Sequence, residues 1–235
     1  DRLDEAEKAY RDSQAILERR LTPEHPNLAQ SYLNLAVFVD QRRNDAAEAE
    51  TLYGKCLAIR RRTLGPSHPM VGQSLQLYGL FLLNQGRLDE SQTLYEEALA
   101  LFRAIDPRHF EVGKCNNGLA LIAARRGHFA AAEERLREVV ALFRDVLGEK
   151  HPFVWQATSN LAEQIGAQGR LAESETLLRS SLERLEELTG RDSQETAQAL
   201  CRLGETLRQA GRAGEAVPIE RRALEAISKI DPDHL

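Results

Sequence analysis

Apolar residues recur along the chain at the spacing of amphipathic helices, and no segment alternates as a strand would. Residues 154–165 carry apolar side chains at steps of three and four, and residues 171–188 repeat this pattern after Gly169. This periodicity predicts two helices joined by a tight turn. Gly169 suits the left-handed position that ends a helix.

The helix pair recurs along the chain with a period of 41 to 43 residues. A fixed period of this size indicates a solenoid, in which each helix pair buries its apolar face against its neighbours. Two markers define the period, a His corner (His25, His68, His109, His151) and a turn glycine (Gly86, Gly127, Gly169, Gly211).

The corner is interpreted as a device that starts a new helix. Ser193 holds the position taken by histidine in the other units, and serine is a strong N-cap residue. Proline is favoured at the first helical position and prevents the preceding helix from continuing. It follows the histidine at Pro26, Pro69 and Pro152.

Small and large residues also recur at fixed distances from the turn glycine. Three sets of equivalent positions, here called columns, show this. They are Ser91, Ala132, Ser174 and Ala216; Tyr95, Leu136, Leu178 and Glu220; and Tyr78, Leu119, Leu161 and Leu203. Each residue of the third column is followed by Gly or Ala. This pattern resembles the tetratricopeptide repeat (TPR) family, and the His-Pro corner resembles its 42-residue variety, found in kinesin light chains and many bacterial regulatory proteins. The resemblance implies an all-α fold, a right-handed superhelical solenoid of helix-turn-helix repeats.

We expect a single array over residues 1–235, with departures from the repeat pattern in its first and last units and at the third corner, where Pro107 precedes His109 by two positions. Asn44 stands where other units have the turn glycine, with one extra residue, and the last helix contains Pro218 and Glu220. Because the array begins and ends within a repeat, we expect it to be part of a larger protein. The expected units are a half repeat at 3–20, repeats at about 25–64, 68–105, 109–147, 151–189 and 193–229, and the start of another at 231–235.

Composition narrows the function classes. A formal net charge of −5 gives no reason to expect nucleic acid, and the longest apolar run, residues 77–83, is too short to span a membrane. Three isolated cysteines, Cys56, Cys115 and Cys201, favour a reducing compartment, so we expect a cytoplasmic protein. The 26 arginines against five lysines suggest a GC-rich, bacterial genome.

We expect no catalytic residues, no metal site and no cofactor, and therefore no enzyme. The corner histidines belong to successive repeats about 10 Å apart, whereas zinc ligands lie about 2 Å from one centre. No phosphate-binding, dinucleotide-binding or serine-nucleophile motif is present. The acidic pairs Glu133-Glu134 and Glu186-Glu187 are expected on a solvated outer face.

The resemblance implies that the first helix of each repeat, the A helix, lines a concave surface that binds peptides. Amides can both donate to and accept from a peptide main chain, although glutamine is also an ordinary soluble helix former. Two leucines and two basic residues would suit a ligand with a hydrophobic anchor beside an acidic residue. The candidate ligand-binding residues are Gln30, Asn34, Gln73, Leu77, Leu80, Lys114, Asn117, Arg125, Gln156, Asn160, Gln198 and Arg202.

The sequence therefore favours a protein–protein interaction module with a protein or peptide partner. A regulatory or sensory arm that controls a fused enzyme domain, such as a kinase, protease or signalling NTPase, is the alternative. Self-association through the exposed terminal helices is a third hypothesis.

Overall fold

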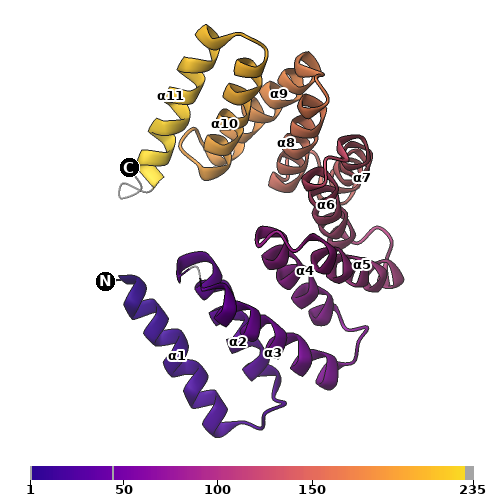
Figure 1. The fold of residues 1–235 in the computed structure, drawn as a ribbon, viewed down its shortest axis with the longest axis vertical. Coiled ribbons are helices and arrows are strands. Elements are labelled where there is room, and N and C mark those ends of the chain that lie inside the picture. The colour runs from indigo at the N-terminus through magenta and orange to yellow at the C-terminus, as the bar shows by residue number, and fades with distance from the viewer. Residues whose placement is uncertain (1, 44, 231–235) are drawn as a thin grey trace. The chain divides into compact units, whose positions relative to one another are not determined.

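The computed structural model describes residues 2–43 and 45–230, which form α-helices and one π-helical segment without a β-strand (Figure 1). The expected all-α fold is confirmed. The A helices are α2 (Pro26–Phe38), α4 (Pro69–Asn84), α6 (Phe110–Arg125), α8 (Pro152–Ala167) and α10 (Gln194–Gln209). The second, or B, helices are α1 (Arg2–Arg20), α3 (Ala46–Leu64), α5 (Leu88–Ile105), α7 (Phe129–Leu147), α9 (Leu171–Thr189) and α11 (Ala213–Ile230).

The chain packs as two compact units, Asp1–Gly118 and Leu119–Leu235, with the boundary inside α6. In the first unit, α2 packs on α3 and α4 on α5, and α3 also contacts α4. In the second unit, α8 contacts α7 and α9, and α10 contacts α9 and α11. Helix pairs thus stack on their neighbours within each unit. A single array over residues 1–235 stays a prediction, and the repeat start expected at 231–235 lies outside the described residues.

The corner residues start helices as the sequence predicts. The Nδ1 atom of each corner histidine accepts the N–H of the second residue after it, at 3.1 Å for His25 and 3.2 Å for the other three. Ser193 accepts the N–H of Thr196 at 3.1 Å through its hydroxyl oxygen. Each side chain satisfies a donor that the first helical turn leaves unpaired. The corner residues therefore act as N-caps, and this structural role is sufficient to explain why they recur.

The turn between the A and B helices depends on positive φ at the marker glycines. The angle is 76° at Gly86, 79° at Gly127, 81° at Gly169 and 74° at Gly211. The first repeat differs because a π-helical segment, η1 (Val39–Arg43), follows α2. Such a segment accommodates one additional residue in a helix, which accounts for the longer first repeat. The turn expected at Asn44 falls on a residue outside those described.

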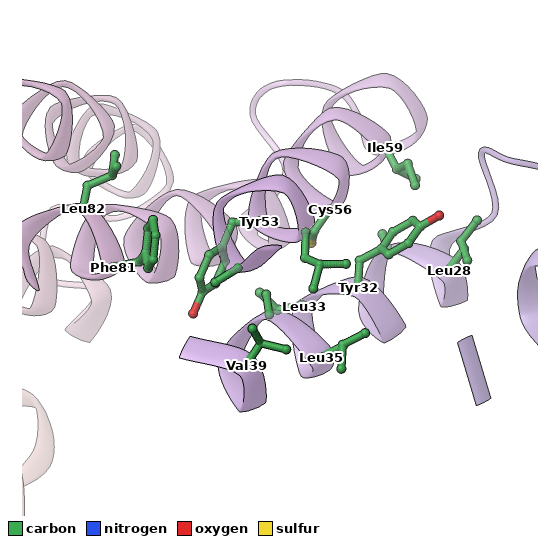
Figure 2. Close-up of a cluster of buried hydrophobic side chains, with 14 residues drawn as sticks. Leu28, Tyr32, Leu33, Leu35, Val39, Tyr53, Cys56, Ile59, Phe81 and Leu82 are labelled. Atoms are coloured by element: carbon green, nitrogen blue, oxygen red, sulfur yellow. The ribbon is translucent and has the colours of Figure 1, made fainter. Parts of the chain in front are cut away.

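A hydrophobic cluster holds α2, α3 and α4 together in the first unit. Figure 2 shows side chains of α2 and α3 turned toward one another, with Phe81 and Leu82 contributed by α4. The rings of Tyr53 and Phe81 have centroids 5.3 Å apart. Burial of one large apolar side chain stabilises by about 1.5–3 kcal/mol. The other labelled members are Leu28, Tyr32, Leu33, Leu35, Val39, Cys56 and Ile59.

The second unit has an equivalent cluster between α8, α9 and α10. Leu178 and Leu182 of α9 face the A helices, together with Trp155 of α8. From α10 come Ala199, Leu200, Leu203 and Leu207. Leu178 and Leu203, two of the large residues predicted at the repeat columns, are therefore among those that fill the space between helices.

Helix α11 accommodates both departures noted in the sequence. Pro218 lies inside the helix, which continues to Ile230. Glu220 packs its aliphatic stem over Gly204, where an added Cβ would lie 2.6 Å from Cγ of Glu220. Its carboxylate pairs with Arg208 at 2.7 Å. An acidic residue thus replaces the usual large apolar one because its stem packs and its charge reaches an arginine.

Ion pairs link successive B helices, and one of them corrects a prediction. Glu133 is buried, with 8% of its surface exposed, so the expected solvated position is wrong for this residue. Burial alone would raise the pKa of Glu133, but hydrogen bonds from Arg137, Gln168 and Arg170 outweigh it and hold the pKa below its usual value. The Arg170 pair joins this α7 carboxylate to the start of α9 at 2.8 Å.

Candidate functional site

The predicted ligand-binding residues that lie five positions after each corner stand on the A helices and reach solvent. Gln30 and Gln73 are exposed in the first unit, and Gln156 and Gln198 are exposed in the second. Lys114 of α6 is half-buried. The equal distance of each residue from its corner explains this common exposure, because the corner sets where every A helix starts. Within each unit, the column places hydrogen-bonding side chains along one helical surface.

In the first unit, Gln30 is already oriented by protein contacts. Its Oε1 accepts from Nη2 of Arg60 at 2.6 Å, and its Nε2 donates to Oδ1 of Asn34 at 2.8 Å. Both candidate residues also line a pocket of about 220 Å³ beside α1, together with Tyr10 and Leu17. The structure therefore brings Gln30 and Asn34 together, as their spacing of one helical turn predicts.

Arg60 is a residue that the sequence analysis missed. Its guanidinium is buried, with only 2% of the residue exposed, and donates to the Met70 carbonyl at 3.1 Å and to the Ser74 hydroxyl at 2.8 Å. It thereby ties α3 to α2 and α4. The sequence does contain a signal for this role, because Arg60 stands at a position where other B helices have the apolar residues Phe102 and Leu185.

The expected hydrophobic anchor region is partly present. Leu77 is 36% exposed and Leu80 is 41% exposed, both on α4. Their exposure is unusual because most other leucines on the A helices are buried in the core. They are therefore available to an apolar ligand group in the first unit.

The expected basic centre on α6 is weaker than predicted. The ammonium of Lys114 pairs with the carboxylate of Glu111 at 2.9 Å and lies 5.7 Å from the ring centroid of Phe110. Its charge is therefore already balanced within the first turns of α6. Asn117 is half-buried and Arg125 is exposed. A preference for an acidic ligand thus depends mainly on Arg125.

Between α4 and α6, side chains close the space that separates the two A helices. Gln76 is buried and its Nε2 donates to the Glu111 carbonyl at 3.2 Å and to Sγ of Cys115 at 2.9 Å. Burial raises the pKa of Cys115 to about 11. Cys115 is therefore a core thiol, and Gln76 acts as a bridge between neighbouring repeats.

The second unit has a pocket of about 250 Å³ between α8 and α10. Three predicted residues, Gln156, Gln198 and Arg202, line it from the two A helices. Leu185 of α9 lines the pocket from the B-helix layer, and Phe153, Ser159 and Glu195 are also among the lining residues. The guanidinium of Arg202 lies 3.5 Å from the carboxylate of Glu163. An apolar surface with surrounding amides and charges can accept a side chain and fix the main chain that carries it.

Among the candidates that lie nine positions after a corner (Asn34, Leu77, Asn160 and Arg202), Asn160 is not exposed as predicted. This residue is only 4% exposed, so its amide lies behind the surface on which Gln156 stands. Residues at this position lie at the edge of the buried helix face, so the neighbouring helix covers each of them to a different extent. At Gly118, the ring of Tyr95 occupies the same region, with atoms 2.4 Å from an added Cβ.

The described residues present neither a metal centre nor a disulfide. No group of three or more His, Cys, Asp or Glu side chains is arranged there to hold a metal ion. Within residues 2–43 and 45–230, every helix is too short or too polar to cross a membrane. All three cysteines are free thiols, with Cys56 and Cys115 buried and Cys201 exposed.

Solved structures with this fold include proteins that carry similar repeats. BtubC (BKLC) from P. vanneervenii is 21% identical, with a TM-score of 0.76, and the match covers 99% of this chain and 94% of that one. The nearly identical TPR-like repeats of a Podosopora anserina protein assigned as a kinesin light chain are 22% identical over 88% of this chain and 98% of that one, with a TM-score of 0.67.

A Rap protein complexed with Competence and Sporulation Factor is 16% identical, with a TM-score of 0.78. The match covers 92% of this chain and 58% of the Rap chain. At these identities the likeness concerns the fold. No curated protein matches the chain in sequence.

Sequence models described as the tetratricopeptide repeat match most of the chain. One model matches residues 75–145 and 155–229, a second matches 28–69, and a third matches 117–184. These matches cover the helix pairs whose columns and corners are described above. The chain belongs to the tetratricopeptide repeat family.

Proposed function

We propose that this chain is a protein-interaction module that binds an extended peptide, or an extended segment of a partner protein, on the surface of its A helices. The TPR fold is consistent with protein–protein interaction. The observation that carries the proposal is the pocket between α8 and α10, where the predicted residues Gln156, Gln198 and Arg202 surround an apolar floor. A Rap protein of similar fold, complexed with Competence and Sporulation Factor, supports it.

The geometry suits a main chain that crosses successive A helices. Neighbouring packed helices lie about 8–10 Å apart, which corresponds to about three residues of an extended chain at about 3.3 Å each. One amide side chain from each A helix can therefore meet a peptide group at every third residue. Because a buried hydrophobic cluster holds the helices in each unit, the binding surface needs little ordering when a peptide binds.

The proposal can be tested by selecting peptides from a random dodecapeptide display library against the whole chain. The affinity of the strongest synthetic peptide is then measured for the wild-type protein and for the double variant Gln156→Ala, Gln198→Ala. Loss of two hydrogen bonds of about 0.5–1.5 kcal/mol each is expected to weaken binding by about tenfold. A matched control is Gln92→Ala on the B helix α5, which should leave the affinity unchanged.

Selected peptides that respond to substitution on B helices, and to none on the A helices, would show that the proposed surface is wrong. Failure to select any peptide that binds the folded chain saturably would also contradict the proposal.

A further inference from the structure

The pocket between α8 and α10 lies at a position that the first unit fills with its own side chains. Counting from the corners, Ser159 of α8 corresponds to Gln76 of α4, since both lie eight residues after a histidine. On the facing helices, Ala199 corresponds to Cys115, both six residues after the corner. The groups that close the site in the first unit, Gln76 and Cys115, are thus replaced in the second unit by smaller ones.

The first replacement removes a bridge between two A helices. Gln76 reaches from α4 to α6, where it donates to the Glu111 carbonyl and to Cys115. Ser159 is too short to span the same distance and lines the pocket. Ala199 is smaller than Cys115 as well. Space for an additional side chain therefore exists between α8 and α10.

The second replacement removes a positive charge. Glu111 lies two residues after the corner His109 and pairs with Lys114 at 2.9 Å. The equivalent pair in the second unit is Glu195 and Gln198, so the carboxylate remains while the cation is replaced by a neutral amide. Glu195 is exposed and lines the pocket. Its side chain therefore lacks the partner that the equivalent carboxylate has within its own helix.

The size and the remaining charges of the pocket define what fits. Its volume is about 250 Å³, whereas an apolar protein cavity of about 150 Å³ accepts benzene. Leu185 supplies the apolar floor and is itself only 3% exposed. Arg202 is already close to Glu163 at 3.5 Å, which leaves Glu195 as the charged lining residue that forms no ion pair within the described part of the chain. A ligand with a positive charge beside an apolar group complements this arrangement.

We propose that the pocket between α8 and α10 accepts a large apolar side chain of a bound peptide, and that a neighbouring lysine or arginine of the peptide pairs with Glu195. The peptide side chain takes the space that Gln76 fills in the first unit, and the peptide cation takes the role of Lys114. This inference rests on the proposed peptide-binding function and specifies the partner: an extended segment with an apolar residue next to a basic one.

The direct test uses a capped heptapeptide of sequence Ser-Ser-Lys-Leu-Lys-Ser-Ser and the whole, isotope-labelled chain. Chemical shifts of backbone amides are followed during titration. Saturable shifts are expected at Phe153, Gln156 and Gln198. Replacement of the peptide leucine by alanine should weaken binding by at least about tenfold, because several buried carbon atoms are lost. Replacement of both lysines by glutamate should weaken it severalfold, with a larger effect at low salt.

Two protein variants reproduce in the second unit the groups that close the first. Ser159→Gln should fill the pocket and reduce binding at least about tenfold, and Gln198→Lys should give Glu195 an internal partner and reduce it severalfold. Matched controls are Ser180→Gln on α9 and Gln92→Lys on α5, which introduce the same side chains on B helices away from the pocket and should bind as wild type. Unfolding curves show whether each variant is folded.

The absence of saturable shifts with the lysine–leucine peptide would overturn the inference. So would equal binding by Ser159→Gln and wild type when both are folded. Either result can occur while library-selected peptides still depend on Gln156 and Gln198, in which case the general peptide-binding surface stands and only the ligand class is wrong. If no peptide responds to any A-helix substitution, the proposed function itself fails.

Discussion

Replacement of Gly118 by alanine tests whether close packing or helix propensity dominates at a helix crossing. Gly118 lies within α6, where alanine is intrinsically favoured over glycine by about 1 kcal/mol. An added Cβ would, however, lie 2.4 Å from Cζ and 2.5 Å from Cε1 of Tyr95. Carbon atoms in ordinary contact are about 3.5–4.0 Å apart. The ring or the helix would therefore have to move by about 1 Å.

The cost of this movement exceeds the gain in propensity. Tyr95 is 5% exposed, so its ring has little free space. Overpacking of a well-packed core costs about 1–3 kcal/mol. Because a contact of 2.4 Å is a severe overlap, we place the cost in the upper half of this range, at about 2–3 kcal/mol. After subtraction of about 1 kcal/mol for the gain in helix propensity, we expect Gly118→Ala to lower the free energy of unfolding by about 1–2 kcal/mol. The control Gly54→Ala, where no atom lies within 4 Å of the added Cβ, should instead raise it by up to about 1 kcal/mol.

The assay is urea unfolding of the whole chain, followed by far-ultraviolet circular dichroism, with the midpoints compared at equal slope. A second substitution isolates the cause. Tyr95→Leu places at this column the residue found at Leu136 and Leu178, and in that background Gly118→Ala should cost less. If Gly118→Ala is as stable as wild type, or if its cost is the same with Leu at position 95, the steric reasoning is refuted.

Three further predictions follow from buried polar groups. The buried Arg60 donates hydrogen bonds to Gln30, Met70 and Ser74. Arg60→Leu should be at least about 2 kcal/mol more stable than Arg60→Ala in urea unfolding, because leucine fills space that alanine would leave as a cavity; equal stability would contradict this. Burial raises the pKa of Cys115 to about 11, whereas the Cys201 thiol is exposed. Iodoacetamide at about pH 8 should therefore modify Cys201 first in the folded chain, which peptide mass analysis can show. Faster modification of Cys115 would be inconsistent with its burial. The pKa of Glu133 is lower in the folded chain than in the unfolded chain, so this carboxylate stabilises the fold above its unfolded pKa, and the contribution is lost as pH falls through its folded pKa. The unfolding free energy should therefore fall between about pH 5 and pH 3, and Glu133→Gln should reduce this pH dependence. An unchanged pH dependence in the variant would exclude Glu133 as its source.

The sequence alone was sufficient for features that arise within one repeat. The N-cap bonds of His68 and Ser193 join atoms two or three residues apart, so a short motif is enough to predict them. The positive φ of Gly86 is likewise a property of one residue in one turn. The periodic apolar residues predict which helix faces are buried, because a helix repeats every 3.6 residues whatever its neighbours are. The exposed positions of Gln30, Gln73, Gln156 and Gln198 were predicted from the resemblance to the repeat family together with their equal spacing from the corners.

Tertiary structure decided the features that depend on side chains from different repeats. Glu133 is buried because Arg170, 37 residues later, supplies a charge to its carboxylate. The space between α8 and α10 exists because Ser159 is short at a position where Gln76 forms a bridge between α4 and α6. Such outcomes depend on the volumes and charges that meet across two helices, and these are combinations that no single helix determines. Local hydrogen bonds and backbone angles are encoded within a few residues, whereas pockets and buried charges are set by the packing of distant ones.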